Sequence, residues 1–133
     1  MSLRQAYIAA FYFLDFHYYV EAKNDDLLID LLSSMNPFFW TDGRPLNSAA
    51  ENDWAEAAKK ITDGELLDVQ QAFQVMREYV KFYKTEFGFN YEWVIADITK
   101  KTYKTPKWLE CVTAAMESPP PSLECVRELW ATQ

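Results

Sequence analysis

The residues that could do chemistry in this chain are few and lie far apart. There is one histidine, His17, and there are two cysteines, Cys111 and Cys125. A structural zinc site needs four clustered soft ligands, and nucleophilic catalysis needs a serine or cysteine beside an activating base. Neither arrangement follows from these spacings. We therefore expect His17 to be a core or rim residue and the cysteines to be buried, reduced thiols, with a disulfide between them as the alternative.

Paired carboxylates are the second chemical feature. Asp26 and Asp30 lie one helical turn apart, and so do Asp53 and Glu56. Helical bundles build di-iron sites from Glu-x-x-His motifs, but His17 does not stand three residues after a glutamate. No glycine-rich loop precedes a helix to cradle a phosphate. The sequence therefore predicts no enzyme, no metal site and no cofactor.

The elements that carry these residues are expected to be helices. The chain has only three glycines and long segments without proline, which favours helices over a sandwich of short strands. Apolar spacing and capping signals predict helices over 3–22, 26–34, 48–61, 62–86, 106–117 and 122–131. Residues 90–101 satisfy neither helical nor strand spacing cleanly, and we assign them to a helix. The prediction is a single all-α domain over residues 1–133, a bundle of about six or seven helices.

The start of the longest helix is predicted from a capping motif. Thr62 to Glu65 has the spacing of a capping box, and Ile61 and Leu66 stand where a hydrophobic staple requires them. We therefore expect this helix to begin at Thr62. Its apolar residues alternate spacings of three and four, which is typical of a face packed on the core.

Asp15 interrupts the apolar run of the first helix. Tyr12 lies about one turn before it, and Tyr18 and Tyr19 about one turn after it. One interpretation is a carboxylate that is bonded by tyrosine hydroxyls or exposed. The other is an acidic anchor within an aromatic patch.

The negative charge is concentrated in the first 68 residues. They hold 12 Asp and Glu against 5 Lys and Arg, whereas residues 69–133 hold 8 of each. The same half is rich in aromatic residues, and acids with aromatics on one surface suit a basic protein partner. The pI near 4.7 argues against nucleic acid or an anionic membrane as the direct partner.

The chain also gives no sign of membrane insertion or secretion. No segment reaches the roughly 18 apolar residues of a membrane span. The apolar run over residues 6–14 is followed by no small-residue cleavage site. We therefore expect a cytoplasmic protein that does not bind membranes.

Partner binding is the remaining role for the acidic half. Aromatic side chains dominate interface energies, and acids accelerate the approach of a basic partner. The candidate partner-binding residues are Asp25, Asp26, Asp30, Trp40, Asp42, Glu51, Asp53, Trp54 and Glu56. For each of them the competing interpretation is a helix cap, a core aromatic or a solvated face.

Three segments of the acidic half carry a family resemblance. They are AFYFLDFHYY, DDLLIDLLSSM and TDGRPLNSAAENDWAEA, within roughly residues 6–60. This pattern resembles small helical immunity proteins of bacterial contact-dependent inhibition and polymorphic toxin systems. The resemblance implies stoichiometric binding and neutralisation of a cognate toxin, a basic nuclease for example, without a cofactor. The alternatives are a non-catalytic helical adaptor or scaffold and, ranked lower, an acidic DNA-mimic inhibitor. The sequence does not indicate the oligomeric state.

Overall fold

The computed structural model describes residues 1–18, 32–33, 35, 40–41, 44–45, 48–87, 101–117 and 119–131. Within these ranges the chain forms five helices: α1 (Leu3–Phe16), α3 (Ser48–Lys59), α4 (Val69–Phe87), α6 (Pro106–Ala115) and α7 (Leu123–Ala131). Two short strands, β1 (Trp40–Thr41) and β2 (Arg44–Pro45), pair antiparallel between the segments predicted as helices over 26–34 and 48–61. Because the described residues are mostly helical, the all-α class is confirmed for this part of the chain, whereas the predicted count of six or seven helices is not confirmed. Most of 26–34 and nearly all of 90–101 lie outside the described residues.

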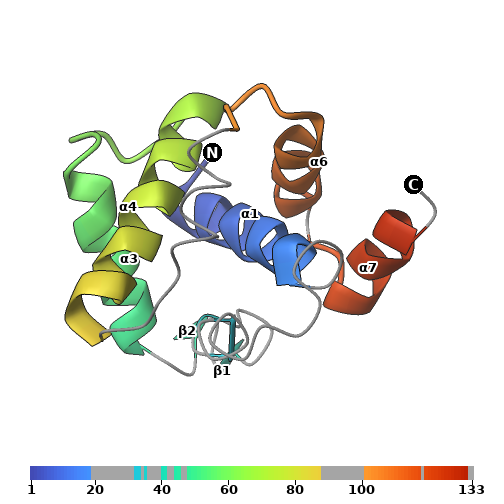
Figure 1. The fold of residues 1–133 in the computed structure, drawn as a ribbon, viewed down its shortest axis with the longest axis horizontal. Helices are drawn as coiled ribbons and strands as arrows, with labels where there is room; N and C mark the ends of the chain where they lie inside the picture. Colours follow the sequence, from blue (N-terminus) through green and yellow to red (C-terminus); the bar gives the residue numbers. More distant parts are fainter. Residues whose placement is uncertain are drawn as a thin grey trace.

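Helix α1 lies at the centre of the fold. Figure 1 shows α3 and α4 on one side of it and α6 and α7 on the other, and α1 contacts all four. Every residue from Ala6 to Asp15 is buried. The helix begins with a capping box, in which the Gln5 N–H donates to Ser2 Oγ at 3.1 Å and the Ser2 N–H donates to Gln5 Oε1 at 2.8 Å. A helix that is apolar on all sides is therefore placed at the centre of the core.

Two tryptophans join the helices around α1. Trp54 of α3 packs edge-to-face on Tyr7 and Tyr79, with ring centroids 5.5 and 5.4 Å apart. Its indole N–H donates to the Leu3 carbonyl at 3.1 Å. Trp108 of α6 is fully buried, and its indole N–H donates to the Val69 carbonyl at 3.2 Å. Each indole thus fills the core with its ring and fixes a helix end with its N–H.

Helix α4 begins at Val69, so the prediction of a start at Thr62 is wrong. The Gln71 N–H donates to Asp68 Oδ1 at 2.7 Å, and the Asp68 N–H donates to Gln71 Oε1 at 3.0 Å. This second capping box starts the helix. Thr62 Oγ1 instead accepts the Gly64 N–H at 3.1 Å, which makes a local turn.

The pairing of the loop between α3 and α4 (residues 60–68) with the chain's first residues explains the later start. The Leu67 N–H donates to the Met1 carbonyl at 2.8 Å, and Ser2 and Leu66 form an antiparallel bridge. An extended backbone at 66–67 cannot also be helical. Leu66, expected to form the staple, is 71% exposed.

An ion pair between the buried Asp15 and the half-buried Arg127 attaches α7 to α1. Arg127 donates from Nε to Asp15 Oδ2 at 3.0 Å and from Nη2 to Oδ1 at 2.7 Å. Asp15 is only 1% exposed, so both interpretations of it are corrected. Its carboxylate is neither exposed nor held by tyrosine hydroxyls, since the Tyr12 hydroxyl donates to the Pro121 carbonyl. Its partner stands 112 positions later in the chain.

The starts of α6 and α7 agree with the sequence. Thr105 precedes α6, with proline at its first turn. Ser122 precedes α7, and its Oγ accepts the Cys125 N–H at 3.3 Å. Both starts lie within one residue of the prediction because they depend on neighbouring residues alone.

Replacing Asp68 with alanine should lower the free energy of unfolding by about 1 kcal/mol, the usual cost of losing a helix cap. Thr62→Ala should cost less than about 0.5 kcal/mol, because Thr62 caps only a turn. Urea denaturation followed by circular dichroism measures both values. An equal or larger loss for Thr62→Ala would contradict the assignment of the helix start.

Replacing Arg127 with methionine should lower the free energy of unfolding by about 3 kcal/mol, because the Asp15 carboxylate would stay buried without a partner. The double variant Asp15→Asn, Arg127→Met should recover part of that loss, since the uncompensated charge is gone. Thermal and urea unfolding of the single and double variants give the coupling energy. A purely additive result would show that the pair does not hold α7.

Candidate functional site

His17 is a core residue, as expected. It is fully buried, and its Nδ1 lies 2.8 Å from the Phe13 carbonyl oxygen. A carbonyl can only accept, so Nδ1 carries the proton and Nε2 is left to accept from Lys101 Nζ at 3.3 Å. Both ring nitrogens therefore have structural partners.

The two cysteines are free and lie in different environments. Cys111 is buried and Cys125 is exposed, so the expectation of two buried thiols is wrong for Cys125. Burial raises the pKa of the Cys111 thiol well above its usual range. Among the described residues, no three His, Cys, Asp or Glu side chains are grouped to hold a metal ion.

The candidate partner-binding residues fall into three groups. Asp25, Asp26, Asp30 and Asp42 lie outside the described residues. Trp40 lies in β1 and Glu51 in α3, where the structure describes the backbone alone. Asp53, Trp54 and Glu56 lie on α3. The structure therefore brings together only the α3 members of the set.

The α3 members face different ways. Trp54 is 2% exposed and belongs to the core, so its ring is not part of a surface. Asp53 is half-buried. Glu56 is exposed and accepts from Lys59 Nζ at 3.0 Å, with both side chains about 70% exposed. Such an exposed pair contributes at most about 1 kcal/mol.

Acidic and aromatic side chains separate in the described part of the acidic half. The rings of Tyr7, Phe11, Tyr12, Phe13 and Trp54 are buried, and those of Phe16 and Tyr18 are partly buried. The exposed carboxylates are those of Glu56, Asp63, Glu65 and Asp68. The expected mixture of outward-facing rings and acids is therefore not found there. Burying a large apolar ring lowers the free energy of the folded protein, whereas burying an unpaired carboxylate raises it.

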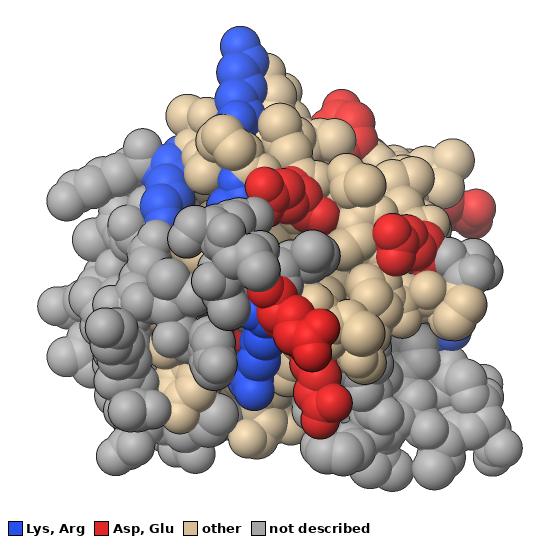
Figure 2. Space-filling view, turned by 90° about the vertical axis from the view of Figure 1, so that its right-hand side faces the viewer, with Lys and Arg blue, Asp and Glu red and all other residues tan. Residues whose placement is uncertain are grey.

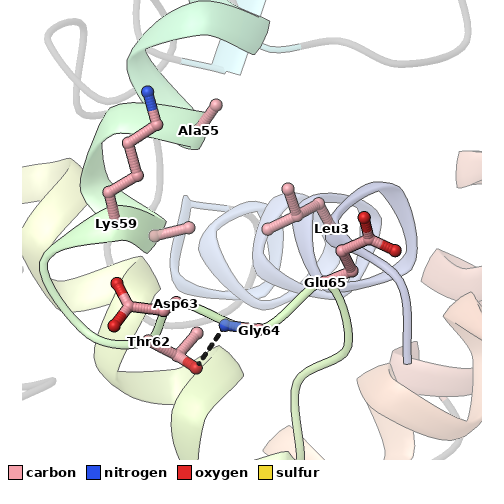
Figure 3. A pocket seen from close by; sticks show the side chains of 8 residues that line it. Leu3, Ala55, Lys59, Thr62, Asp63, Gly64 and Glu65 are labelled. Atoms are coloured by element: carbon pink, nitrogen blue, oxygen red, sulfur yellow. Dashed lines mark hydrogen bonds between the residues drawn. The ribbon is translucent and has the colours of Figure 1, made fainter.

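A hollow of about 430 Å³ lies among α3, the 60–68 loop and the first residue of α1. We call it the α3–loop hollow. Its lining residues are Leu3, Ala55, Ala58, Lys59, Thr62, Asp63, Gly64 and Glu65. In Figure 3, Leu3 faces Ala55 and Lys59 across an open space, and the loop residues close one end. The hollow thus has an apolar part and a charged edge.

The charged edge carries two carboxylates and one ammonium group, that of Lys59. Asp63 and Glu65 are exposed, and neither forms a hydrogen bond or an ion pair with a described residue. Lys59 is already bonded to Glu56. The two carboxylates on either side of Gly64 are therefore available to a cation from outside.

Sequence reasoning missed Asp63 and Glu65 as site residues because it placed them in the first turn of a helix. The Asp63-Gly64 pair is a turn signal that competes with the capping-box spacing, and in the structure the turn forms. In a turn, both carboxylates are exposed to solvent. In the first turn of a helix, they would interact with the free backbone N–H groups of that turn.

The face formed by α6 and α7 has a different charge pattern. Figure 2 shows acidic and basic side chains together on this face. Lys107 Nζ and Glu110 Oε2, for example, lie 2.7 Å apart on α6. This face therefore carries charges of both signs and would not select a partner by its overall charge.

No protein-family model, curated protein or solved structure matches this chain. Within the described ranges, no helix has both the length and the apolar character needed to cross a bilayer. Function therefore has to be inferred from the surface geometry and the charge pattern.

In the folded protein, a thiol reagent such as Ellman's reagent should modify Cys125 within minutes at pH 8 and leave Cys111 unmodified. The reactive species is the thiolate, and the raised pKa of Cys111 together with its burial keeps it scarce and shielded. Cys111 should react only after denaturant is added. Cys125→Ser should abolish native labelling and Cys111→Ser should preserve it; the reverse pattern would contradict the assignment.

Proposed function

We propose that this protein is an immunity protein that binds and neutralises a cognate, basic bacterial toxin domain by stoichiometric contact. The observation that carries the proposal is the set of exposed carboxylates on α3 and the 60–68 loop: Glu56, Asp63, Glu65 and Asp68. They belong to the half of the chain that holds its whole surplus of negative charge. The family resemblance of residues 6–60 points the same way.

Electrostatics favours a basic partner for this surface. A surface of one sign attracts a partner of the opposite sign over several ångströms and raises the association rate, an effect that salt screens. Domains that act on nucleic acids present cationic surfaces to phosphates. An acidic protein can cover such a surface, whereas it repels nucleic acid and anionic membranes. Neutralisation would take place in the cytoplasm, where such a toxin acts.

The acidic surface stands on a firmly held backbone, which favours binding. The Ile61 and Thr62 N–H groups both donate to the Ala58 carbonyl, at 3.0 and 2.9 Å, and continue α3 into the loop. The far end of the loop is held by the pairing of Leu67 with Met1. A surface that is already ordered loses less conformational entropy when a partner binds.

Neutralising three exposed acids of α3 and the 60–68 loop should slow association with the toxin. The variant Glu56→Gln, Asp63→Asn, Glu65→Gln removes three negative charges from exposed side chains, and at low salt we expect an association rate on the order of tenfold lower. Stopped-flow mixing with the purified product of the gene directly upstream, where the proposal expects the toxin gene, measures the rate. Growth of cells that co-express both proteins reports protection.

The matched control is Glu117→Gln, Glu124→Gln, Glu128→Gln, which removes the same charge from α7 and the segment before it. It should leave the association rate within about twofold of wild type, because these acids belong to the half of the chain in which acidic and basic residues are equal in number. Equal effects of the two triple variants would refute the acidic surface as the binding site. Absence of both a complex and protection with the wild-type protein would refute the immunity function.

A helical adaptor is the second candidate, and one observation favours it. Leu109 and Met116 of the α6 region are 41% and 49% exposed and lie two turns apart. This gives the chain a second exposed apolar area, on a different element from the 60–68 loop. An adaptor would hold two partners at the same time, and size-exclusion chromatography with light scattering would detect such a ternary complex.

A further inference from the structure

We propose that Asp63 is a site of spontaneous modification, at which the aspartate converts to isoaspartate through a cyclic succinimide. The inference goes beyond the proposed function and does not depend on it, because it concerns the chemistry of the Asp63–Gly64 linkage alone. It bears on the acidic surface all the same, since Asp63 is one of the exposed carboxylates there.

The reaction needs no enzyme and no co-reactant other than water. The Gly64 backbone nitrogen attacks the carbon of the Asp63 side-chain carboxyl group. A C–N bond forms, and the amide proton leaves with the carboxyl hydroxyl group as water. Water then opens the five-membered ring at either of its two carbonyl carbons. Opening at the side-chain carbonyl restores aspartate, whereas opening at the main-chain carbonyl leaves the chain running through the side chain, which is isoaspartate.

Glycine at position 64 leaves the attacking nitrogen accessible. Every other residue type carries a Cβ atom near that nitrogen, which hinders ring closure. Gly64 is exposed, and its backbone conformation is one that other residues adopt readily. A Cβ built on it would meet the Leu66 carbonyl oxygen and Thr62 Oγ1 at 3.5 Å each, an ordinary contact distance. An alanine at this position should therefore leave the fold unchanged while shielding the nitrogen.

The linkage lies outside the helices, between the end of α3 at Lys59 and the start of α4 at Val69. Ring closure requires rotation about the Cα–C bond of Asp63, and a helix would hold that angle near about −42°. The Gly64 N–H donates to Thr62 Oγ1 at 3.1 Å, as the dashed line in Figure 3 shows. A side-chain hydroxyl thus holds the attacking amide, and removing this hydroxyl should speed the reaction.

The side chain of Asp63 can reach the reactive geometry. Figure 3 shows its carboxyl group turned away from the Gly64 nitrogen, so the side chain must rotate before the attack. It is exposed and forms no hydrogen bond or ion pair with a described residue. Exposed side chains change rotamer within nanoseconds, far faster than the covalent step.

The other aspartates of the described ranges lack this combination. Asp15 is buried in an ion pair, and Asp53 lies inside α3. Asp68 precedes the β-branched Val69, and its carboxylate caps α4. Within these ranges the reaction should therefore be confined to Asp63.

Isoaspartate would change the shape of the acidic surface without changing its charge. The main chain gains one atom between residues 63 and 64, and the free carboxylate moves onto the α-carbon. Backbone hydrogen bonds hold the loop at Thr62 and at Leu67. A longer chain between these two points must displace the residues between them, Glu65 included.

Ageing of the purified protein at neutral pH and physiological temperature, sampled over several weeks, tests the inference. Tryptic cleavage after Lys60 and Arg77 gives a peptide that contains both Asp63 and Asp68. Isoaspartate has the same mass as aspartate, but its peptide elutes separately and gives diagnostic fragments on electron-transfer dissociation. It should accumulate at position 63 and not at position 68. Its absence at 63, or equal amounts at both positions, would overturn the inference.

Two variants and a control separate the causes. Gly64→Ala should lower the rate at position 63 at least about tenfold, because the added Cβ shields the nitrogen. Thr62→Val should raise it on the order of threefold, the effect of losing one hydrogen bond. Thr113→Val, which removes an exposed hydroxyl from α6, should leave it unchanged. An unchanged rate in Gly64→Ala would overturn the succinimide route, and one in Thr62→Val would overturn the role of the hydroxyl; circular dichroism reports whether each variant is folded.

Asp63→Asn should react faster than the wild-type protein, since ammonia leaves a side-chain amide more readily than water leaves a carboxyl group. Each conversion creates a carboxylate, so anion-exchange chromatography should show a new, more acidic peak that grows with time. A variant that stays neutral at position 63 would contradict the proposed accessibility of the Gly64 nitrogen. None of these results depends on whether the protein binds a toxin, so the inference and the proposed function stand or fall separately.

Discussion

The burial of α1 on all sides is the constraint on which the rest of the structure depends. A helix enclosed from Ala6 to Asp15 can keep polar atoms only if other segments supply partners for them. The Tyr7 hydroxyl donates to the Met35 carbonyl, the Tyr12 hydroxyl to the Pro121 carbonyl, and Asp15 binds Arg127. These contacts select which distant segments pack on α1, which apolar burial alone would not do.

The same constraint shapes the surface. Because α1 needs rings around it, the described aromatics of the acidic half, Trp54 included, are mostly used in the core. The surface above them is left to carboxylates and to a few aliphatic groups such as Leu66. In the proposed recognition the rings would act indirectly, by holding α3 against α1 through Trp54, and contact with a partner would fall to the carboxylates and aliphatic groups of the surface.

Local signals predicted much of the fold, and the failures occurred where distant residues decide. The apolar character of α1 and the starts of α6 and α7 depend on residues that are close in sequence, within one or two helical turns. The start of α4 does not, because two capping boxes compete and pairing with Met1 and Ser2 decides between them. The partner of Asp15 stands 112 positions away, so no periodicity could reveal it. The error at Thr62 also concealed the carboxylates of the candidate site, since the turn that displays them was assigned to a helix.

Long-range charge and local shape have different roles in the proposed recognition. A net surplus of seven negative charges attracts many basic proteins and decides little about how any one of them docks. Docking in one orientation needs a place where a particular side chain fits and where a wrong one leaves charges unpaired. The exposed carboxylates of Glu56, Asp63 and Glu65 stand on α3 and the 60–68 loop, where backbone hydrogen bonds fix their positions. The charge of the acidic half would then govern the rate of encounter, and the arrangement of these carboxylates would govern which encounters persist.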